Sequence, residues 1–192
     1  ISGVAPSVND PISSNNANIT GLLNILDLSR KHAVERFVFS SSSSVYGGSE
    51  DLPTNELCKL NPKSPYALQK KVGEEYCAMF SSLYGLDTVS LRYFNVYGPR
   101  QKDHFIPEFI NRIKKRRYEL YGFKNKRSFI YIDDAIKATI KASNIKKKNE
   151  IINIGSDVES KIIDVARLIM KIFKMGSWVG FGPIWTADSN ST

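Results

Sequence analysis

The sequence predicts an α/β fold in which a long helix connects two parallel strands. The first strand is the apolar run at residues 36–40, which leads directly into a stretch of serines. The second is residues 88–94, which are rich in β-branched and aromatic side chains. A segment of helical length lies between them, and a strand, a helix and a strand at this spacing predict a right-handed parallel β–α–β unit.

The helix of this unit has clear signals at both ends. Ser64 is a favourable N-cap, and Pro65 suits the first helical position. Gly85 stands where a helix-terminating glycine is expected. Between these ends, apolar side chains recur at roughly helical spacing, at Tyr66, Ala67, Val72, Tyr76, Met79, Phe80 and Leu83.

The other elements follow from the same kinds of signals. Before the first strand, an apolar stripe from Ile19 to Leu28 indicates a helix with cations near its end at residues 30–32. After the second strand, Gly98 and Pro99 break the pattern. Beyond this break we expect a helix over residues 105–117, a short strand at 119–121, a helix capped by Asp133, a strand at 150–154, and a helix that Ser160 opens and that ends near Lys174.

Composition indicates a soluble, cytoplasmic globular protein. Of 192 residues, 42% are hydrophobic and 24% are charged. No apolar run is long enough to span a bilayer, and no signal peptide is visible, so we expect no membrane partner. Cys58 and Cys77 form no redox motif and are expected to be free thiols in a reducing compartment. No spacing of histidines and acids indicates a metal site.

The net charge of +8 comes largely from two basic runs, residues 113–117 and 146–148. One interpretation is a nucleic-acid surface. A solvated helix end and a solvated loop are favoured instead, because no aromatic residues interleave with these runs. We therefore expect no nucleic-acid partner.

The most informative local pattern is a tyrosine and a lysine four residues apart, Tyr66 and Lys70. On a helix these side chains lie on the same face, one turn from each other. A free phenol has a pKa of about 10, so it acts as a base at neutral pH only where a nearby cation stabilises the phenolate. With a hydroxyl from a strand end, such a pair can move a proton to and from a sugar or alcohol hydroxyl. Ordinary amphipathic helices also carry this spacing, so the pair alone does not establish chemistry.

Three blocks of sequence together resemble the extended short-chain dehydrogenase/reductase family. They are F-S-S-S-S-S-V-Y-G at residues 39–47, S-P-Y-A-L-Q-K at 64–70 and L-R-Y-F-N-V-Y-G-P-R at 91–100. Within the family they look most like nucleotide-sugar 4-epimerases that act on UDP-hexoses. Residues 127–133 resemble a further block of the family, with Ser128 where Asp is usual. The resemblance reaches about Lys174.

The resemblance implies an incomplete Rossmann-like, doubly wound parallel sheet with part of a smaller α/β substrate domain. A partial NAD-binding domain would comprise residues 1–94 and 134–156, and a partial substrate-binding domain residues 95–133 and 157–174. Residues 175–192 match nothing in the family and are left unassigned. No G-x-x-G-x-x-G loop follows a strand near the start. We therefore interpret the sequence as an N-terminally truncated fragment of a larger enzyme, which puts tight dinucleotide binding by this chain in doubt.

The resemblance also implies roles for individual residues. The catalytic residues would be Ser42, Tyr66 and Lys70. The cofactor, NAD, would contact Ser40, Ser41, Tyr66, Lys70 and Phe94. The substrate would contact Ser43, Ser44, Asn95, His104, Phe105, Tyr121 and Arg127, with Arg127 on the diphosphate and Tyr121 on the uracil. Plainer interpretations stay open from the residues themselves, namely serines that satisfy backbone groups in a turn, a solvated Arg127 and aromatic side chains of ordinary strands.

The implied reaction is NAD-dependent epimerisation at C4 of a UDP-hexose through a 4-keto intermediate. The UDP-sugar would carry glucose or galactose, an N-acetylhexosamine or glucuronate, and the full-length parent would be a homodimer. A nucleotide-sugar 4,6-dehydratase ranks low, because Ser43 and Ser44 stand where such enzymes carry an acidic pair. A decarboxylase or a reductase of the same family stays open. The alternative from another class is an inactive truncated remnant or a partner-binding module.

Overall fold

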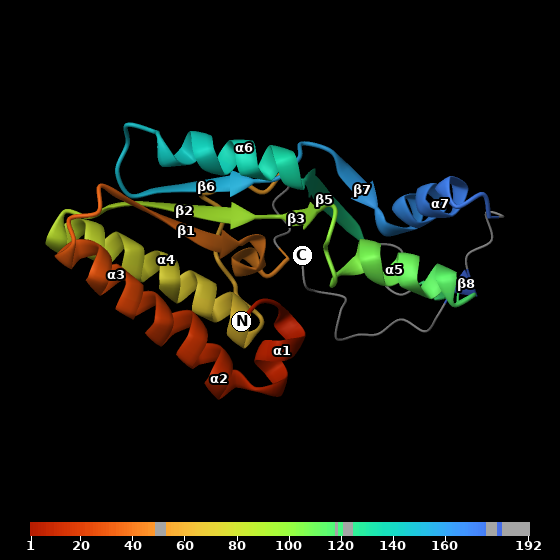
Figure 1. Cartoon of the computed structure of the whole chain (residues 1–192), viewed down its shortest axis with the longest axis horizontal. Coiled ribbons are helices and arrows are strands. Elements are labelled where there is room, and N and C mark those ends of the chain that lie inside the picture. The colour runs from red at the N-terminus through yellow and green to blue at the C-terminus, as the bar shows by residue number, and fades with distance from the viewer. Residues whose placement is uncertain (49–52, 118, 121–124, 176–179, 182–192) are drawn as a thin grey trace. The chain divides into compact units, whose positions relative to one another are not determined.

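The computed structural model describes residues 1–48, 53–117, 119–120, 125–175 and 180–181 (Figure 1). The chain divides into two compact units. The first unit contains Ile1–Phe94 and Ala135–Ile154, and the second contains Asn95–Asp134 and the described residues from Gly155 to Phe181.

The first unit is built on a parallel sheet. Its strands are β1 (Arg36–Ser42), β2 (Asp87–Tyr93) and β6 (Glu150–Ile154), in the order β1-β2-β6. Both strand pairs are parallel, as the sequence predicts. Helices α3 and α4 lie on one side of this sheet, and α6 lies on the other (Figure 1). The mixed α/β fold with a parallel sheet is therefore confirmed.

Helix α4 (Pro65–Tyr84) is the element that the sequence specifies best. The Ser64 side chain accepts a hydrogen bond from the Ala67 amide at 3.1 Å, and Gly85 ends the helix at a φ of 70°. Glycine is also required within the helix, because a Cβ at Gly73 would lie 2.4 Å from Cζ of Phe39. Gly73 thus allows α4 to pack closely on β1.

The other helices of the first unit precede β1 or follow β2. They are α1 (Val4–Asn9), α2 (Pro11–Asn15), the π-helix η1 (Asn16–Thr20), α3 (Gly21–Lys31) and, across the unit boundary, α6 (Ile132–Ser143). A cluster of buried side chains from α3, β1, α4 and the residue just before β2 comprises Leu22, Leu26, Phe39, Cys77 and Leu86. The apolar stripe expected on α3 is only partly buried, since Ile25 is 52% and Leu28 is 49% exposed.

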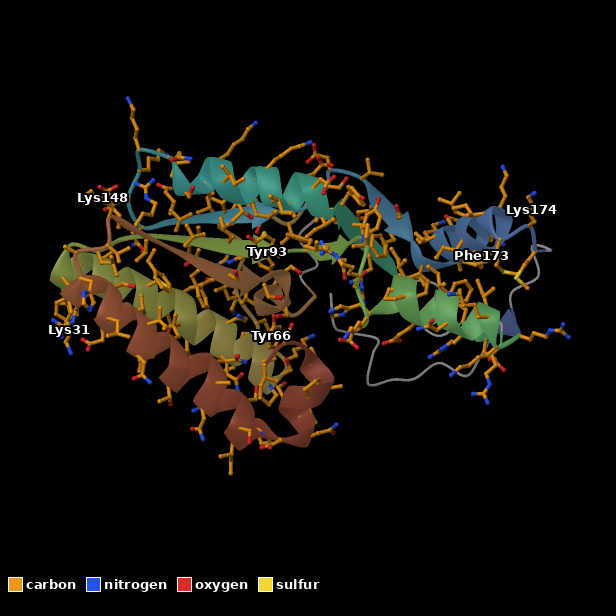
Figure 2. The ribbon with its side chains drawn as sticks, in the orientation of Figure 1. Lys31, Tyr66, Tyr93, Lys148, Phe173 and Lys174 are labelled. Carbon is orange, nitrogen blue, oxygen red and sulfur yellow. The ribbon has the colours of Figure 1, made fainter. Side chains whose placement is uncertain are left out.

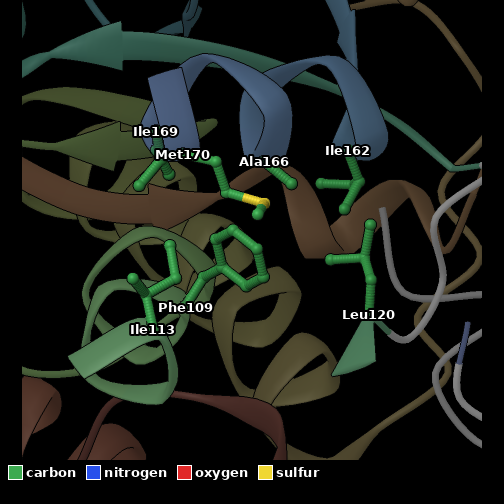
Figure 3. Close-up of a cluster of buried hydrophobic side chains, with 7 residues drawn as sticks. All are labelled: Phe109, Ile113, Leu120, Ile162, Ala166, Ile169 and Met170. Atoms are coloured by element: carbon green, nitrogen blue, oxygen red, sulfur yellow. The ribbon is translucent and has the colours of Figure 1, made fainter. Parts of the chain in front are cut away.

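The second unit has short strands and two amphipathic helices. Strand β5 (Lys126–Tyr131) pairs in parallel with β3 (Asn95–Tyr97) and antiparallel with β7 (Glu159–Lys161). Strand β4 (Glu119–Leu120) pairs in parallel with β8 (Gly180–Phe181). Helices α5 (Phe105–Lys114) and α7 (Ile162–Ile172) meet through apolar side chains. Figure 3 shows this buried cluster, which consists of Phe109, Ile113, Leu120, Ile162, Ala166, Ile169 and Met170.

Three expected boundaries in this part of the chain are wrong. Helix α5 ends at Lys114 rather than at residue 117, and Arg116 has a φ of 56°, which a helix does not allow. Ser160 does not open a helix, because its backbone pairs with Arg127 in the sheet and α7 begins at Ile162. Asp133 lies in the first turn of α6 rather than at its cap.

Most of the segment at residues 175–192 lies outside the described residues, and so does Tyr121. Cys58 and Cys77 are free, as predicted. Among the described residues, no helix has the length and apolarity needed to cross a membrane. The same part of the chain holds no group of three or more His, Cys, Asp or Glu side chains suited to a metal ion.

Candidate active site

The serine run forms the end of β1 and the turn that follows it. Ser42 is the last residue of the strand and caps the short 3-10 helix η2 (Ser43–Tyr46). Its Oγ accepts hydrogen bonds from the amide and the hydroxyl of Ser44, at 3.2 and 3.0 Å. Ser42 and Ser44 are half-buried, so both hydroxyls lie near the surface at the carboxyl end of a parallel strand. Ligands of open α/β sheets bind at such strand ends.

The neighbouring serines differ because side chains alternate along a strand. Ser40 is exposed, whereas Ser41 is buried and donates its hydroxyl to the carboxylate of Glu74. The Ser41 side chain therefore points into the interior, and only the Ser41 backbone is available to contact a cofactor. Ser43 is also buried, with 6% of its surface exposed.

Lys70 joins α4 to the end of β1. Its Nζ donates to the carbonyl of Ser40 at 2.7 Å, and lies 5.1 Å from the ring centroid of Phe39 and 5.6 Å from that of Tyr66. Burial lowers the pKa of the Lys70 ammonium. Figure 2 places Tyr66 at the N-terminal end of α4, where its side chain is half-buried. The structure thus brings together the serine run, Tyr66 and Lys70 within the first unit.

The N-terminal helices hold the first turns of α4 in place. The hydroxyl of Ser7, which is fully buried, accepts a hydrogen bond from the amide of Tyr66 at 3.0 Å. One turn later, Gln69 Oε1 accepts from Ser14 Oγ and from Asn18 Nδ2, each at 2.8 Å. These polar contacts fix the part of α4 that carries Tyr66 and Lys70.

A buried ion pair lies beneath the serine run. Arg92 Nε donates to Glu74 Oε1 at 2.9 Å, and Arg92 Nη2 donates to Glu74 Oε2 at 2.7 Å. Burial works against the charge of Arg92, but hydrogen bonds to Glu74 and Tyr46 outweigh it and raise its pKa. Sequence reasoning missed this pair. The pair could have been predicted from Arg92, because an arginine inside an apolar strand is buried and a buried charge requires a partner.

The last aromatic of the unit, Phe94, follows β2. Its amide donates to the carbonyl of Ile154 at 2.9 Å, and its ring centroid lies 6.5 Å from that of Tyr46. The ring is half-buried, which suits both a contact with a planar ligand and an ordinary packing role.

The remaining expected site residues belong to the second unit. Asn95 donates its side-chain amide to the carbonyl of Ser128 at 3.1 Å. Arg127 is half-buried and donates to the carbonyl of Lys126 at 3.3 Å. His104 is exposed and has a φ of 75°. Phe105 stacks on Phe109 with 5.6 Å between ring centroids, so its ring packs against the apolar core of this unit.

Residues 1–155 match the model of the NAD dependent epimerase/dehydratase family. The chain belongs to this family. The family consists of enzymes that use NAD, which confirms the resemblance drawn from the three sequence blocks.

Relatives in the family have several activities. The chain is 40% identical over 157 residues to a UDP-glucuronate 4-epimerase of Thermodesulfobacterium geofontis, covering 80% of this chain and 48% of the relative. It is 36% identical over 183 residues to a UDP-N-acetyl-alpha-D-glucosaminuronate decarboxylase of Bacillus cytotoxicus, covering 90% of this chain and 56% of the relative. The chain thus spans about half the length of the curated relatives it matches.

Solved structures of epimerases match the fold closely. The UDP-N-acetylglucosamine 4-epimerase of Methanobrevibacter ruminantium, in complex with UDP-N-acetylmuramic acid, matches with a TM-score of 0.93 at 31% identity, covering 99% of this chain and 63% of that one. The UDP-glucuronic acid 4-epimerase of Bacillus cereus, in complex with NAD, matches with a TM-score of 0.80 at 32% identity. The match covers 86% of this chain and 55% of that one. The expectation of a Rossmann-like fold is confirmed.

The residues present fit one end of an NAD molecule. An ammonium has three N–H donors, and within the described residues the Ser40 carbonyl is the one hydrogen-bond acceptor of Lys70. Two donors are therefore left for a polar ligand such as a ribose hydroxyl. The given sequence contains no glycine-rich phosphate loop of the kind that binds the pyrophosphate of a dinucleotide.

Proposed function

We propose that this chain carries the proton-transfer residues of a NAD-dependent UDP-sugar 4-epimerase. The observation that carries the proposal is the arrangement of Lys70, which is held by the Ser40 carbonyl at 2.7 Å and faces the ring of Tyr66. The serine hydroxyls lie at the end of the strand that supplies this carbonyl. The names of the relatives and neighbouring structures, most of them UDP-sugar 4-epimerases, support the same activity.

In this proposal the chain removes the proton of the sugar 4-hydroxyl and later returns it. Tyr66 takes the proton as a general base, and Lys70 stabilises the phenolate by its charge. The Ser42 hydroxyl, already oriented by Ser44, binds the sugar oxygen and aligns it with Tyr66. NAD, when bound, would supply the reversible oxidation and reduction at C4 that passes through the 4-keto sugar. Reprotonation by Tyr66 completes the cycle without net redox change.

The two units then have different tasks. We assign the first unit, with Ser40, Ser41 and Phe94, to the cofactor, and the second unit to the UDP-sugar. Arg127 suits the diphosphate because a guanidinium binds phosphate oxygens through paired N–H groups. Asn95 and His104 are assigned to the same ligand, and Tyr121 to the uracil. Phe105 contributes to this binding surface through its packing on Phe109 rather than through a polar contact.

Ser43 and Ser44 favour epimerisation over dehydration. Loss of water from the sugar needs an acid and a base, and a serine hydroxyl supplies neither as readily as a carboxylate. Glucose or galactose, N-acetylhexosamine and glucuronate forms of the UDP-sugar are the candidate substrates. A decarboxylase acting on a UDP-uronate is the second candidate function, and the 36% identity to the Bacillus cytotoxicus enzyme favours it.

The proposed parent protein is a cytoplasmic homodimer. Helices α3 and α4 pack together in the first unit and carry several half-exposed apolar side chains, namely Ile25, Leu28, Leu68, Met79, Leu83 and Tyr84. A second copy of the same two helices would bury this surface as a four-helix interface. Free cysteines accord with a reducing compartment.

The experiment that tests the proposal compares the 192-residue chain with a form extended upstream in its own reading frame. NAD binding is measured by calorimetry, and each UDP-sugar is then incubated and its products are identified by NMR. The proposal expects NAD binding and interconversion of C4 epimers by the extended form, with loss of turnover in Ser42→Ala. A carbon dioxide product from a UDP-uronate would identify the decarboxylase. Absence of NAD binding by both forms would favour the inactive remnant or the partner-binding module.

A further inference from the structure

Glu74 and Arg92 are charged side chains placed in the interior of the first unit. Glu74 is 5% exposed and Arg92 is 2% exposed. Removing two charges from water costs free energy that their attraction often does not recover, and well-packed apolar residues frequently replace such pairs without loss of stability. Stability alone therefore does not account for this pair.

The pair contacts the chain on both sides of the serine hydroxyls. Ser41, directly before Ser42, donates its hydroxyl to Glu74. Tyr46, at the end of η2, accepts a hydrogen bond from Arg92 Nη1 at 2.8 Å and donates to Asn153 Oδ1 at 2.7 Å. The segment that carries Ser42, Ser43 and Ser44 is thus held at its start and at its end.

The same pair belongs to the helix of the proton-transfer residues. Glu74 lies four residues after Lys70 and eight after Tyr66, so the three side chains share one face of α4. Because Arg92 is on β2 and Ser41 is on β1, the carboxylate of Glu74 fixes α4 against both strands. The distance between the Ser42 hydroxyl and the Tyr66 phenol depends on this alignment.

We propose that Glu74 and Arg92 are positioning residues, which set the geometry between the Ser42 hydroxyl and the Tyr66–Lys70 pair without touching substrate or cofactor. This inference rests on the proposed function. A misplacement of about 1 Å between reacting groups lowers turnover by about 100-fold. The pair therefore acts on turnover more than on substrate affinity.

The test measures kcat, KM and the thermal midpoint in the active, extended form of the protein. The variants are Glu74→Gln and Ser41→Ala, with Thr88→Val as the matched control. Thr88 is 1% exposed on β2 and donates to the carbonyl of Cys77 on α4 at 3.3 Å, so it links the same two elements away from the serine run. We expect kcat to fall by about 100-fold in Glu74→Gln and about 10-fold in Ser41→Ala at unchanged KM. Thr88→Val is expected to lower the midpoint but to keep kcat within about twofold.

A second readout does not depend on turnover and uses the 192-residue chain itself. The amide of Ser44 donates to Ser42 Oγ, so its NMR chemical shift and exchange rate report on the serine turn. Both quantities should change in Ser41→Ala and Glu74→Gln and stay unchanged in Thr88→Val.

The outcomes separate this inference from the proposed function. If Tyr66→Phe keeps full turnover, the proposed function fails. A second outcome would overturn the positioning role while the proposed function stands. In it, Tyr66→Phe is inactive, but Glu74→Gln loses no more kcat than Thr88→Val does for the same fall in thermal midpoint. If Glu74→Gln does not fold, Ser41→Ala decides, because it leaves the ion pair in place. An unchanged Ser44 amide in Ser41→Ala would also overturn it.

Discussion

The interiors of the two units differ in their polarity. Among the described residues, the buried polar and charged side chains all belong to the first unit, including Ser7, Ser41, Gln69, Glu74 and Arg92. The buried cluster of the second unit consists entirely of apolar side chains. Hydrogen bonds specify distance and direction, whereas apolar packing specifies mainly volume. The first unit, which carries the proposed proton-transfer residues, is therefore also the unit in which buried hydrogen bonds fix the directions of side chains.

The largest effect that we expect is on turnover in the first unit. Tyr66→Phe removes the proposed base while keeping the ring that faces Lys70, so kcat should fall by about 10²–10⁴-fold. UDP-sugar epimerisation by the extended protein measures this loss. Tyr76→Phe, on the same helix, is the matched control and should keep full turnover. Equal activity of both variants would contradict the assignment of Tyr66.

In the second unit the same kind of truncation should act on stability. Phe109 is 2% exposed and packs between α5 and α7, so Phe109→Ala should lower the free energy of unfolding by about 3–5 kcal/mol. Urea unfolding measures this change. Leu168→Ala, at a side chain that is 57% exposed on α7, should change it by less than about 0.5 kcal/mol. A similar loss in both variants would show that the apolar cluster does not stabilise this unit.

A smaller effect is expected where α4 packs on β1. A Cβ at Gly73 would lie 2.4 Å from Phe39 Cζ and 3.1 Å from Leu22 Cδ2, so Gly73→Ala should destabilise by about 1–3 kcal/mol through overpacking. Gly21→Ala is the control, because its Cβ would meet the Asn16 carbonyl at an ordinary 3.7 Å. That variant should be neutral or slightly stabilising. A combined Gly73→Ala and Phe39→Leu change should recover part of the loss, and its failure to do so would argue against the clash.

The smallest effect at neutral pH concerns the thiols. Burial raises the pKa of Cys77 from 9.0 to about 12, so Cys77 should resist thiol reagents at pH 8 while the half-buried Cys58 reacts. Because the folded-state pKa is raised, the contribution of the protonated thiol to stability is complete below pH 9.0 and is lost as pH rises through about 12.

A disulfide reagent should titrate one thiol in the native chain and both in denaturant. Cys58→Ser should leave no rapid reaction, and two rapid thiols in the native chain would contradict the burial of Cys77.

Local signals determined much of the fold and part of the candidate site. Ser64 and Gly85 mark the ends of α4 because a helix terminus needs partners that a few neighbouring residues supply. The spacing of Tyr66 and Lys70 also predicts their position, because residues four apart on a helix lie on the same face. The error at Ser160 lies where a local pattern competes with sheet pairing, whereas α5 ends before residue 117 because Arg116 has a positive φ. Ser160 resembles a helix start, but its backbone bonds to Arg127 in β5.

The sequence by itself determined the family and the parallel β–α–β unit, since each follows from short patterns along the chain. It also predicts Ser42, Tyr66 and Lys70 as proton-transfer residues, and this assignment stays a proposal. Tertiary structure decided which serine points inward, and it brought Ser41, Glu74 and Arg92 together from β1, α4 and β2. Ser41 and Glu74 are 33 positions apart, and Glu74 and Arg92 are 18 apart. The physical reason is that a buried charge finds its partner through packing of distant elements, which no local propensity encodes.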